Sequence, residues 1–109
     1  MTPELDREPT VVTIAFSGDL AAHSLEDLRA ALADAESSDI VVLDLCAADY
    51  IDSTALTAFV LLRNRMLKCG RLGTIRIVAP SASVRRIFEV CHLDKLFKLY
   101  GSVPEALTG

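Results

Sequence analysis

The stretch that decides the fold begins with Ile40-Val41-Val42-Leu43-Asp44 and leads, after a short connection, to Asp52-Ser53-Thr54. Four of its first five residues are apolar and three of those are β-branched, which is typical of a strand buried on both faces. Asp and Ser are side chains that satisfy the free N–H groups at a helix start. The stretch therefore predicts a buried strand, a loop that ends at Asp52, and a helix that runs to about Lys68.

Outward from this stretch, strands and helices alternate. We expect a strand over 10–17, a helix over 24–35, the strand from 40, the helix over 52–68, a strand over 74–78, a helix over 83–91, a turn or short strand within 93–100 and a helical turn over 103–107. This alternation favours parallel pairing through right-handed crossovers, and the N-terminal strands can add antiparallel pairs. The expected architecture is an α/β (α+β) single domain, a mixed sheet of four or five strands packed against three or four helices.

Local signals mark where these elements begin and end. Gly18-Asp19 is predicted to end the first strand. Ser24, with Asp27 three residues later, resembles a capping box. Gly70 is well placed as the residue with positive φ that follows a helix, and Ser83 can cap the next one.

Length, composition and charge restrict the class of protein. The 109 residues, 51% apolar and 24% charged, indicate one folded domain over 1–109, with residues 1–9 as a loose arm or a short edge strand around Glu4 to Arg7. The net charge of −4 disfavours wholesale nucleic-acid binding. The N-terminus lacks the apolar segment of a signal peptide, and no run approaches the roughly 18 residues of a membrane span. A cytoplasmic protein without a membrane partner is expected.

The three cysteines, Cys46, Cys69 and Cys91, are odd in number and match no metal-ligand spacing. We expect free, small, buried thiols. Cys69 and Cys91 lie near predicted helix C-termini, where the helix dipole disfavours a thiolate, so a redox sensor is the weaker alternative. No metal site is predicted. No catalytic residue is predicted either, because the two histidines lie far in sequence from any nucleophile.

The helix over 52–68 carries more apolar residues than one buried face requires. A core stripe is expected from Leu56, Phe59, Val60, the stem of Arg63 and Leu67, widened by Ala55, Leu62 and Met66. A different face then holds Thr54, Ala58, Leu61 and Arg65. This face is either an exposed surface for a protein partner or a second core surface against neighbouring helices.

Thr54 has two interpretations. On pattern alone, Asp52-Ser53-Thr54 before an apolar run is first a helix cap. In the second interpretation Thr54 is phosphorylated, which places close to two negative charges at the positive end of a helix. A phosphate on a neutral binding face opposes docking by repulsion and desolvation.

Five segments together resemble the STAS domain, and more narrowly the stand-alone bacterial anti-sigma factor antagonists. They are Ser17-Gly18-Asp19-Leu20, Glu26-Asp27-Leu28-Arg29, Val41-Val42-Leu43-Asp44-Leu45, Tyr50-Ile51-Asp52-Ser53-Thr54-Ala55-Leu56 and Val84-Arg85-Arg86-Ile87-Phe88-Glu89. The resemblance covers about residues 10–107, and its most specific part is the Leu-Asp-Leu strand followed by Ile-Asp-Ser-Thr.

The resemblance implies a binding protein without catalytic activity or cofactor. The unphosphorylated antagonist binds an anti-sigma factor that is itself a Ser/Thr protein kinase, which frees the sigma factor; the kinase phosphorylates the antagonist, and a PP2C-like phosphatase reverses this. It implies Thr54 as phosphoacceptor, flanked by Asp52, Ser53 and Ala55. It implies partner contacts from the loop after the first long strand and the exposed face of the central helix, namely Gly18, Asp19, Ala21, His23, Ser24, Thr54, Ala58, Leu61 and Arg65.

Three departures from the family pattern leave alternatives open. Ala55 stands where Gly is common, Ala21 where many members have Asp, and His92 where a Gly usually ends the third helix. Ala21 and Ala55 are consistent with a constitutive binding module that lacks the phosphate switch. A small-ligand or nucleotide sensor, or a transport-accessory protein, is a further alternative, although the Gly70 to Gly73 turn lacks the features of a phosphate-binding loop.

Overall fold

A four-stranded parallel sheet forms the centre of the computed structural model, which describes residues 9–109. The strands lie in the order β1 (Val11–Leu20), β2 (Ile40–Ile51), β3 (Thr74–Val78) and β4 (Lys98–Tyr100). Each is parallel to its neighbour, so the antiparallel pairing expected from the N-terminal strands is not found within residues 9–109. The edge strand expected around Glu4 to Arg7 lies outside the described residues.

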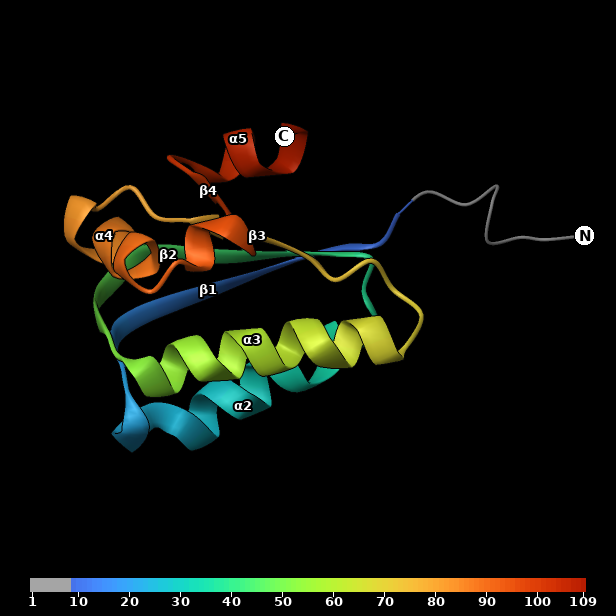
Figure 1. Ribbon diagram of the computed structural model, residues 1–109, viewed down its shortest axis with the longest axis horizontal. Helices are drawn as coiled ribbons and strands as arrows, with labels where there is room; N and C mark the ends of the chain where they lie inside the picture. Colours follow the sequence, from blue (N-terminus) through green and yellow to red (C-terminus); the bar gives the residue numbers. More distant parts are fainter. Residues whose placement is uncertain (1–8) are drawn as a thin grey trace, which may run out of the picture.

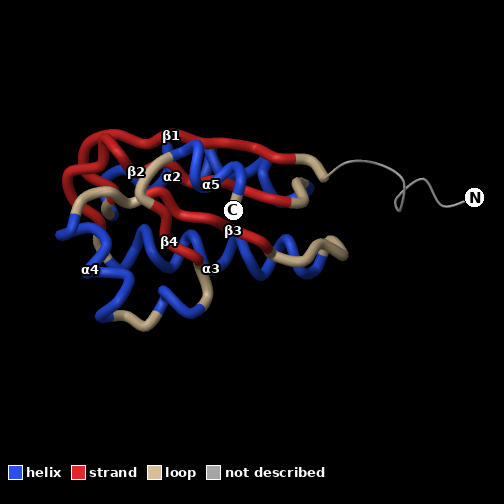
Figure 2. The backbone as a smooth tube through the Cα atoms, turned by 90° about the horizontal axis from the view of Figure 1, so that it is seen from above, coloured by secondary structure: helices blue, strands red, loops and turns tan. Residues whose placement is uncertain are grey.

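Helices cover both faces of this sheet (Figures 1 and 2). They are α2 (Leu25–Ala33), α3 (Ser53–Lys68), α4 (Ala82–Val90) and α5 (Val103–Thr108), with short 3-10 turns η1 (Ala22–Ser24), η2 (Asp34–Ser37) and η3 (Leu93–Lys95). The helices α2 and α3 run side by side on one face, and α5 lies on the other. The predicted α/β domain is confirmed, and the ends of the strand over 74–78 are as predicted.

The alternating side chains of β2 divide the core into two layers. Val41, Leu43 and Leu45 belong to the larger cluster, which they share with α2, α3 and α4. Val42 points the other way, into a smaller cluster with Tyr100 and α5. The prediction of a strand buried on both faces is therefore confirmed at Val41, Val42 and Leu43, which are fully buried.

Two strands are longer than predicted. The strand β1 does not end at Gly18-Asp19 but continues to Leu20, and β2 includes the residues 46–51 that were expected to form a loop. The extensions pair with each other, Ser17 with Ala47 and Leu20 with Ile51, across register shifts at Ala15/Ser17 and Gly18/Asp19. Pairing between distant segments thus overrides the weak strand propensity of both.

Two of the predicted helix caps are wrong. The Ser24 hydroxyl does not cap α2; it accepts a hydrogen bond from the Ala21 N–H at 3.1 Å and lies 3.0 Å from the Asp19 carbonyl oxygen, to which it can donate. Ser83 lies inside α4, which begins after Ser81, and the hydroxyls of these two serines are 2.9 Å apart.

A residue with positive φ follows α3 and another follows α4, at the two positions where the sequence indicates a helix end. Gly70 follows α3 with φ of 80°, as predicted. His92 follows α4 with φ of 60°, and it is the one residue other than glycine in the described chain with positive φ. A left-handed conformation at this point ends the helix but costs energy for a residue with a Cβ.

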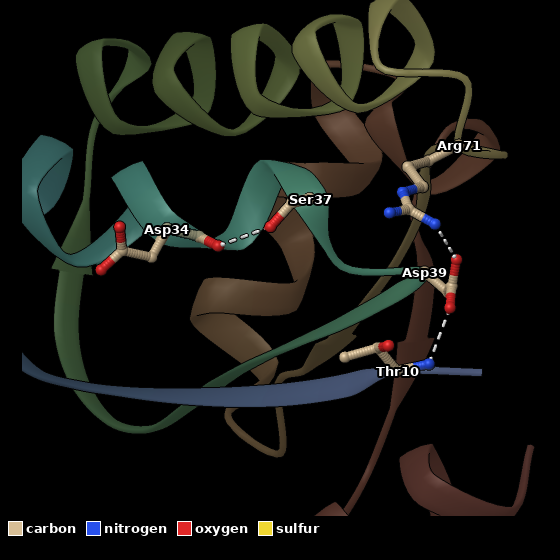
Figure 3. A network of polar contacts seen from close by, with 5 residues as sticks. All are labelled: Thr10, Asp34, Ser37, Asp39 and Arg71. Atoms are coloured by element: carbon tan, nitrogen blue, oxygen red, sulfur yellow. Dashed lines mark hydrogen bonds and ion pairs between the residues drawn. The ribbon is translucent and has the colours of Figure 1, made fainter. Parts of the chain in front are cut away.

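Asp39 joins the starts of two strands to the turn after α3 (Figure 3). Its Oδ2 accepts from the Thr10 N–H at 2.7 Å, and its Oδ1 accepts from Arg71 Nη1 at 2.9 Å. The backbone N–H groups of Asp39 and Ile40 both donate to the Thr10 carbonyl. These contacts fix β1, β2 and the end of α3 relative to one another. None of the described helices is long and apolar enough to cross a membrane.

Candidate partner-binding groove

A groove of about 250 Å³ is lined by the N-terminal parts of α2 and α3, which begin at the same end of the molecule (Figure 1). Its lining comes from Leu25 and Arg29 on α2 and from Ser53, Thr54, Thr57, Ala58 and Leu61 on α3. We call this the α2–α3 groove. It brings Thr54, Ala58 and Leu61 together from the predicted partner-binding face, and it includes the predicted phosphoacceptor.

Asp52 positions the start of α3. Its backbone is extended and its Oδ1 accepts from the Thr54 N–H at 3.0 Å and the Ala55 N–H at 3.1 Å. The predicted role of Asp52 as helix cap is thereby confirmed. Its own N–H donates to the Leu20 carbonyl at 3.0 Å, which holds the end of β1 against the start of the helix.

The hydroxyls at the start of α3 differ in what they contact. Thr57 Oγ1 donates to the Ser53 carbonyl at 2.8 Å and is thereby engaged. The Ser53 and Thr54 hydroxyls form no hydrogen bond with any of residues 9–109. Because Asp52 carries out the capping, the Thr54 side chain is not required for it. Thr54 is half-buried and Ser53 is exposed, and both line the groove.

The apolar floor of the groove shows that the two interpretations of this helix face are each half right. Ala58 is only 7% exposed and belongs to the main core, as expected for a second core surface. Leu61, one turn later, is 44% exposed, as expected for a surface that a partner covers. Leu25 of α2 is half-buried beside them.

The opposite face of α3 is rotated relative to the predicted stripe. Ala55, Leu62 and Met66, expected only to widen the stripe, are fully buried. Leu67, expected in the core, is 43% exposed, so that prediction is wrong. The complete burial of Ala55 also means that the substitution for the usual Gly faces the core and not the groove.

Arg65 lies outside the groove. Its Nε donates to Glu36 Oε2 at 3.0 Å, which joins the end of α3 to η2. Both side chains remain about two-fifths exposed, with values of 42% and 38%. The structure therefore gives Arg65 a structural contact, and its predicted partner contact stays a prediction.

The segment over 18–24 runs from the end of β1 through η1 to the start of α2. Gly18 has φ of 74° and Asp19 is exposed within β1, whereas the Ala21 side chain is buried. His23 is exposed in η1, and Ser24 is held by the hydrogen bonds described above. None of residues 18–24 lines the groove. Of the contacts predicted in this segment, Asp19 and His23 are exposed and Ala21 is buried, so their predicted partner contacts stay a prediction.

The cysteine prediction is half wrong. Cys46, Cys69 and Cys91 are free thiols, as expected, but all three are exposed. Cys46 lies in the extension of β2, and Cys69 and Cys91 follow directly after α3 and α4. A hydrogen bond from its thiol to Asp44, together with the nearby negative charge, raises the pKa of Cys46, which lowers its thiolate fraction at neutral pH.

Sequence reasoning missed three lining residues, Leu25, Arg29 and Thr57. Arg29 follows Leu25 by four residues, which places both on one side of α2. The missing information was that α2 and α3 lie side by side, which is a tertiary contact. No group of three or more potential ligands within residues 9–109 is placed to hold a metal ion.

Comparison with known proteins agrees with the observed fold. The STAS domain model matches residues 2–106. The anti-sigma-F factor antagonist RsfB of Mycobacterium tuberculosis is 27% identical over 101 residues, which span 91% of this chain and 80% of that protein. An anti-sigma factor antagonist from Mycobacterium paratuberculosis has a TM-score of 0.78 at 28% identity, over 89% of this chain and 83% of that one.

A putative anti-sigma factor antagonist from Thermotoga maritima shares the fold, with a TM-score of 0.77 at 22% identity over 90% of this chain and 85% of that one. RsfB and the Mycobacterium paratuberculosis protein are anti-sigma factor antagonists by name, the class of protein that the sequence resembles. Because the family model spans nearly all of the sequence, the chain belongs to the STAS domain family.

Proposed function

We propose that this chain is an anti-sigma factor antagonist, which binds an anti-sigma factor at the α2–α3 groove and thereby releases a sigma factor. The names of its relatives support the class of partner. The groove supports the place, because it combines an apolar floor with exposed polar groups at its rim, as is typical of protein-binding surfaces. The proposed activity is binding, and no chemical step is assigned to this chain.

The observation that carries the proposal is the arrangement of Asp52 and Thr54. Asp52 satisfies the N–H groups at the start of α3, and the Thr54 hydroxyl lines the groove without a hydrogen-bond partner among residues 9–109. A hydroxyl that the fold does not use can be modified without loss of the helix cap. This is the property that a switch inside a binding surface requires.

The proposed switch is phosphorylation of Thr54 by the anti-sigma factor acting as a Ser/Thr kinase. The Thr54 oxygen takes the γ-phosphoryl group of ATP, the bond to ADP breaks, and the hydroxyl proton is released. The product carries close to two negative charges next to the apolar floor at Ala58 and Leu61. Desolvating that charge opposes docking, so phosphorylation lowers affinity, and a PP2C-like phosphatase restores it by hydrolysis.

A constitutive antagonist is the second candidate, and Ala21 favours it. Ala21 is buried and supplies no carboxylate at a position where many members of the family have Asp. Ala55 no longer supports this candidate, because its side chain is in the core. The two candidates share the groove and the partner, and differ only in the response to ATP.

The experiment is capture of partners from the native cytoplasm with wild-type protein and with Thr54→Glu, followed by incubation of the captured anti-sigma factor with the wild type and ATP. Mass spectrometry of the 52–63 region should find phosphate on Thr54. Ser53→Ala is the matched control, since it removes the neighbouring hydroxyl and should still be phosphorylated. An unmodified Thr54, with equal capture by Thr54→Glu, would reject the switch and leave the constitutive antagonist.

A further inference from the structure

Arg29 is the one charged side chain that lines the α2–α3 groove in the described part of the chain. Its side chain is 61% exposed, and its only ion pair within residues 9–109 is with Glu26, where Arg29 Nη1 lies 3.9 Å from Oε1. Glu26 is itself 91% exposed, and ion pairs between exposed residues on one helix contribute little to stability. The guanidinium is therefore free to exchange this partner for a stronger one.

Arg29 and Thr54 line the same groove, and the Arg29 side chain leans toward the N-terminal end of α2. Helix side chains lean toward the N-terminus of their helix, and the contact with Glu26, three residues earlier, shows that Arg29 does so. The helices α2 and α3 run in the same direction and begin at the same end of the molecule (Figure 1), and residues from the first turn of each helix line the groove. Arg29 thus extends toward the end of the groove at which Thr54 lies.

We propose that Arg29 is the counter-ion of a phosphate on Thr54, and that the phosphorylated state is held by a contact across the groove from α2 to α3. This inference rests on the proposed function, since it concerns the phosphorylated form. Arg binds phosphate oxygens through two parallel N–H groups, a stronger contact than a single exposed carboxylate provides. It also offsets the repulsion between the phosphate and Asp52, two residues earlier.

The contact gives the switch a second component. In the unphosphorylated chain, Arg29 stands at the rim of an open groove, where its charge is available to a carboxylate of the partner. In the phosphorylated chain, the same guanidinium binds the phosphate, and the aliphatic part of the Arg29 side chain lies across the apolar floor. Phosphorylation then removes a favourable charge from the binding surface in addition to introducing an unfavourable one.

The test is phosphorus NMR on the full chain with phosphothreonine incorporated at position 54 during synthesis, which requires no kinase. A nearby cation stabilises the phosphate dianion and lowers its second pKa. Arg29→Gln should therefore raise the second pKa of the phosphate by about half a pH unit. Arg29→Lys keeps the charge without the paired N–H groups and should give a smaller rise.

Lys68→Gln is the charge-matched control. It removes one exposed positive charge at the far end of α3, about 21 Å from Thr54 at 1.5 Å per residue, which is beyond the screening length of roughly 10 Å at 0.1 M salt. Its phosphate should titrate as in the wild type. Circular dichroism of each variant confirms that the fold is retained, as expected for exposed positions.

A phosphate that titrates identically in the wild type and in Arg29→Gln would overturn the inference, as would an equal rise in Lys68→Gln. Failure of the proposed function gives a different result. In that case the partner binds phosphorylated and unphosphorylated chains equally, whatever the titration shows. The two proposals can therefore fail separately.

Discussion

Asp52 Oδ1 lies 3.0 Å from the backbone nitrogen of Thr54, so the carboxylate, and not the threonine hydroxyl, caps the central helix. This hydrogen bond separates two roles that the sequence places in adjacent residues. Asp52 caps the start of α3, and the Thr54 side chain lines the groove without taking part in the cap. The central claim about function depends on that separation.

Removing the cap should affect stability. Asp52→Ala leaves the Thr54 and Ala55 N–H groups without their acceptor and should lower the free energy of unfolding by about 1 kcal/mol. Asp52→Asn retains an acceptor oxygen and should cost less. Urea denaturation followed by circular dichroism measures both. If Thr54→Ala were as destabilising as Asp52→Ala, the threonine would be part of the cap and the separation of roles would be wrong.

Two exposed leucines on α3 test whether the groove is the binding surface. Leu61 lines the groove and Leu67 does not, yet their exposed fractions are 44% and 43%. Leu61→Asp should weaken binding of the anti-sigma factor at least about tenfold, equivalent to about 1.4 kcal/mol, because it places a charge in the interface. Leu67→Asp should bind as the wild type, with a similar effect on stability. Titration calorimetry measures the dissociation constants. An equal loss of affinity in both variants would argue against the groove as the binding surface.

The left-handed positions after α3 and α4 form a complementary pair. His92 has φ of 60° and carries a Cβ, whereas Gly70 has φ of 80°, and a Cβ added there would meet no atom within 4 Å beyond its chain neighbours. His92→Gly should raise the free energy of unfolding by up to about 1 kcal/mol, and Gly70→Ala should lower it by about 1 kcal/mol through backbone strain alone. Thermal and urea unfolding measure both changes. A stabilising Gly70→Ala would contradict the left-handed conformation at this position.

The environment of Cys46 predicts slow alkylation. Because Asp44 raises the pKa of the thiol, less thiolate is present at any pH below that pKa, and thiolate is the reactive form. Asp44→Asn lowers the pKa and should speed the reaction of Cys46 with iodoacetamide at pH 8. Cys69 and Cys91 in the same sample serve as internal controls, with unchanged rates. Peptide mapping over time gives the three rates, and an unchanged Cys46 rate would exclude Asp44 as the cause.

Local signals in the sequence were sufficient for the central unit. The Asp52 cap and the glycine at 70 act through contacts within a few residues, and the run at Ile40 to Leu43 is rich in β-branched residues that favour strands. All three predictions are confirmed. The residues over 46–51 are a strand only because the end of β1 pairs with them. That pairing depends on contacts about 30 residues apart, which strand propensity does not encode.

The candidate site likewise combines residues that helical periodicity predicts with residues that only tertiary packing brings together. Thr54, Ala58 and Leu61 share a helix face and follow from helical periodicity. Leu25 and Arg29 join them only because α2 packs beside α3, and the exposure of the three cysteines depends likewise on the packing of neighbouring elements. Residue type alone predicts that these thiols are buried, whereas the tertiary arrangement leaves all three exposed.

The most direct test of the central claim is the dissociation constant of the captured anti-sigma factor for two forms of the chain, unmodified and phosphorylated at Thr54, measured by titration calorimetry at one salt concentration. The switch at the α2–α3 groove predicts at least about tenfold weaker binding of the phosphorylated form, about 1.4 kcal/mol. Equal dissociation constants for the two forms would contradict it.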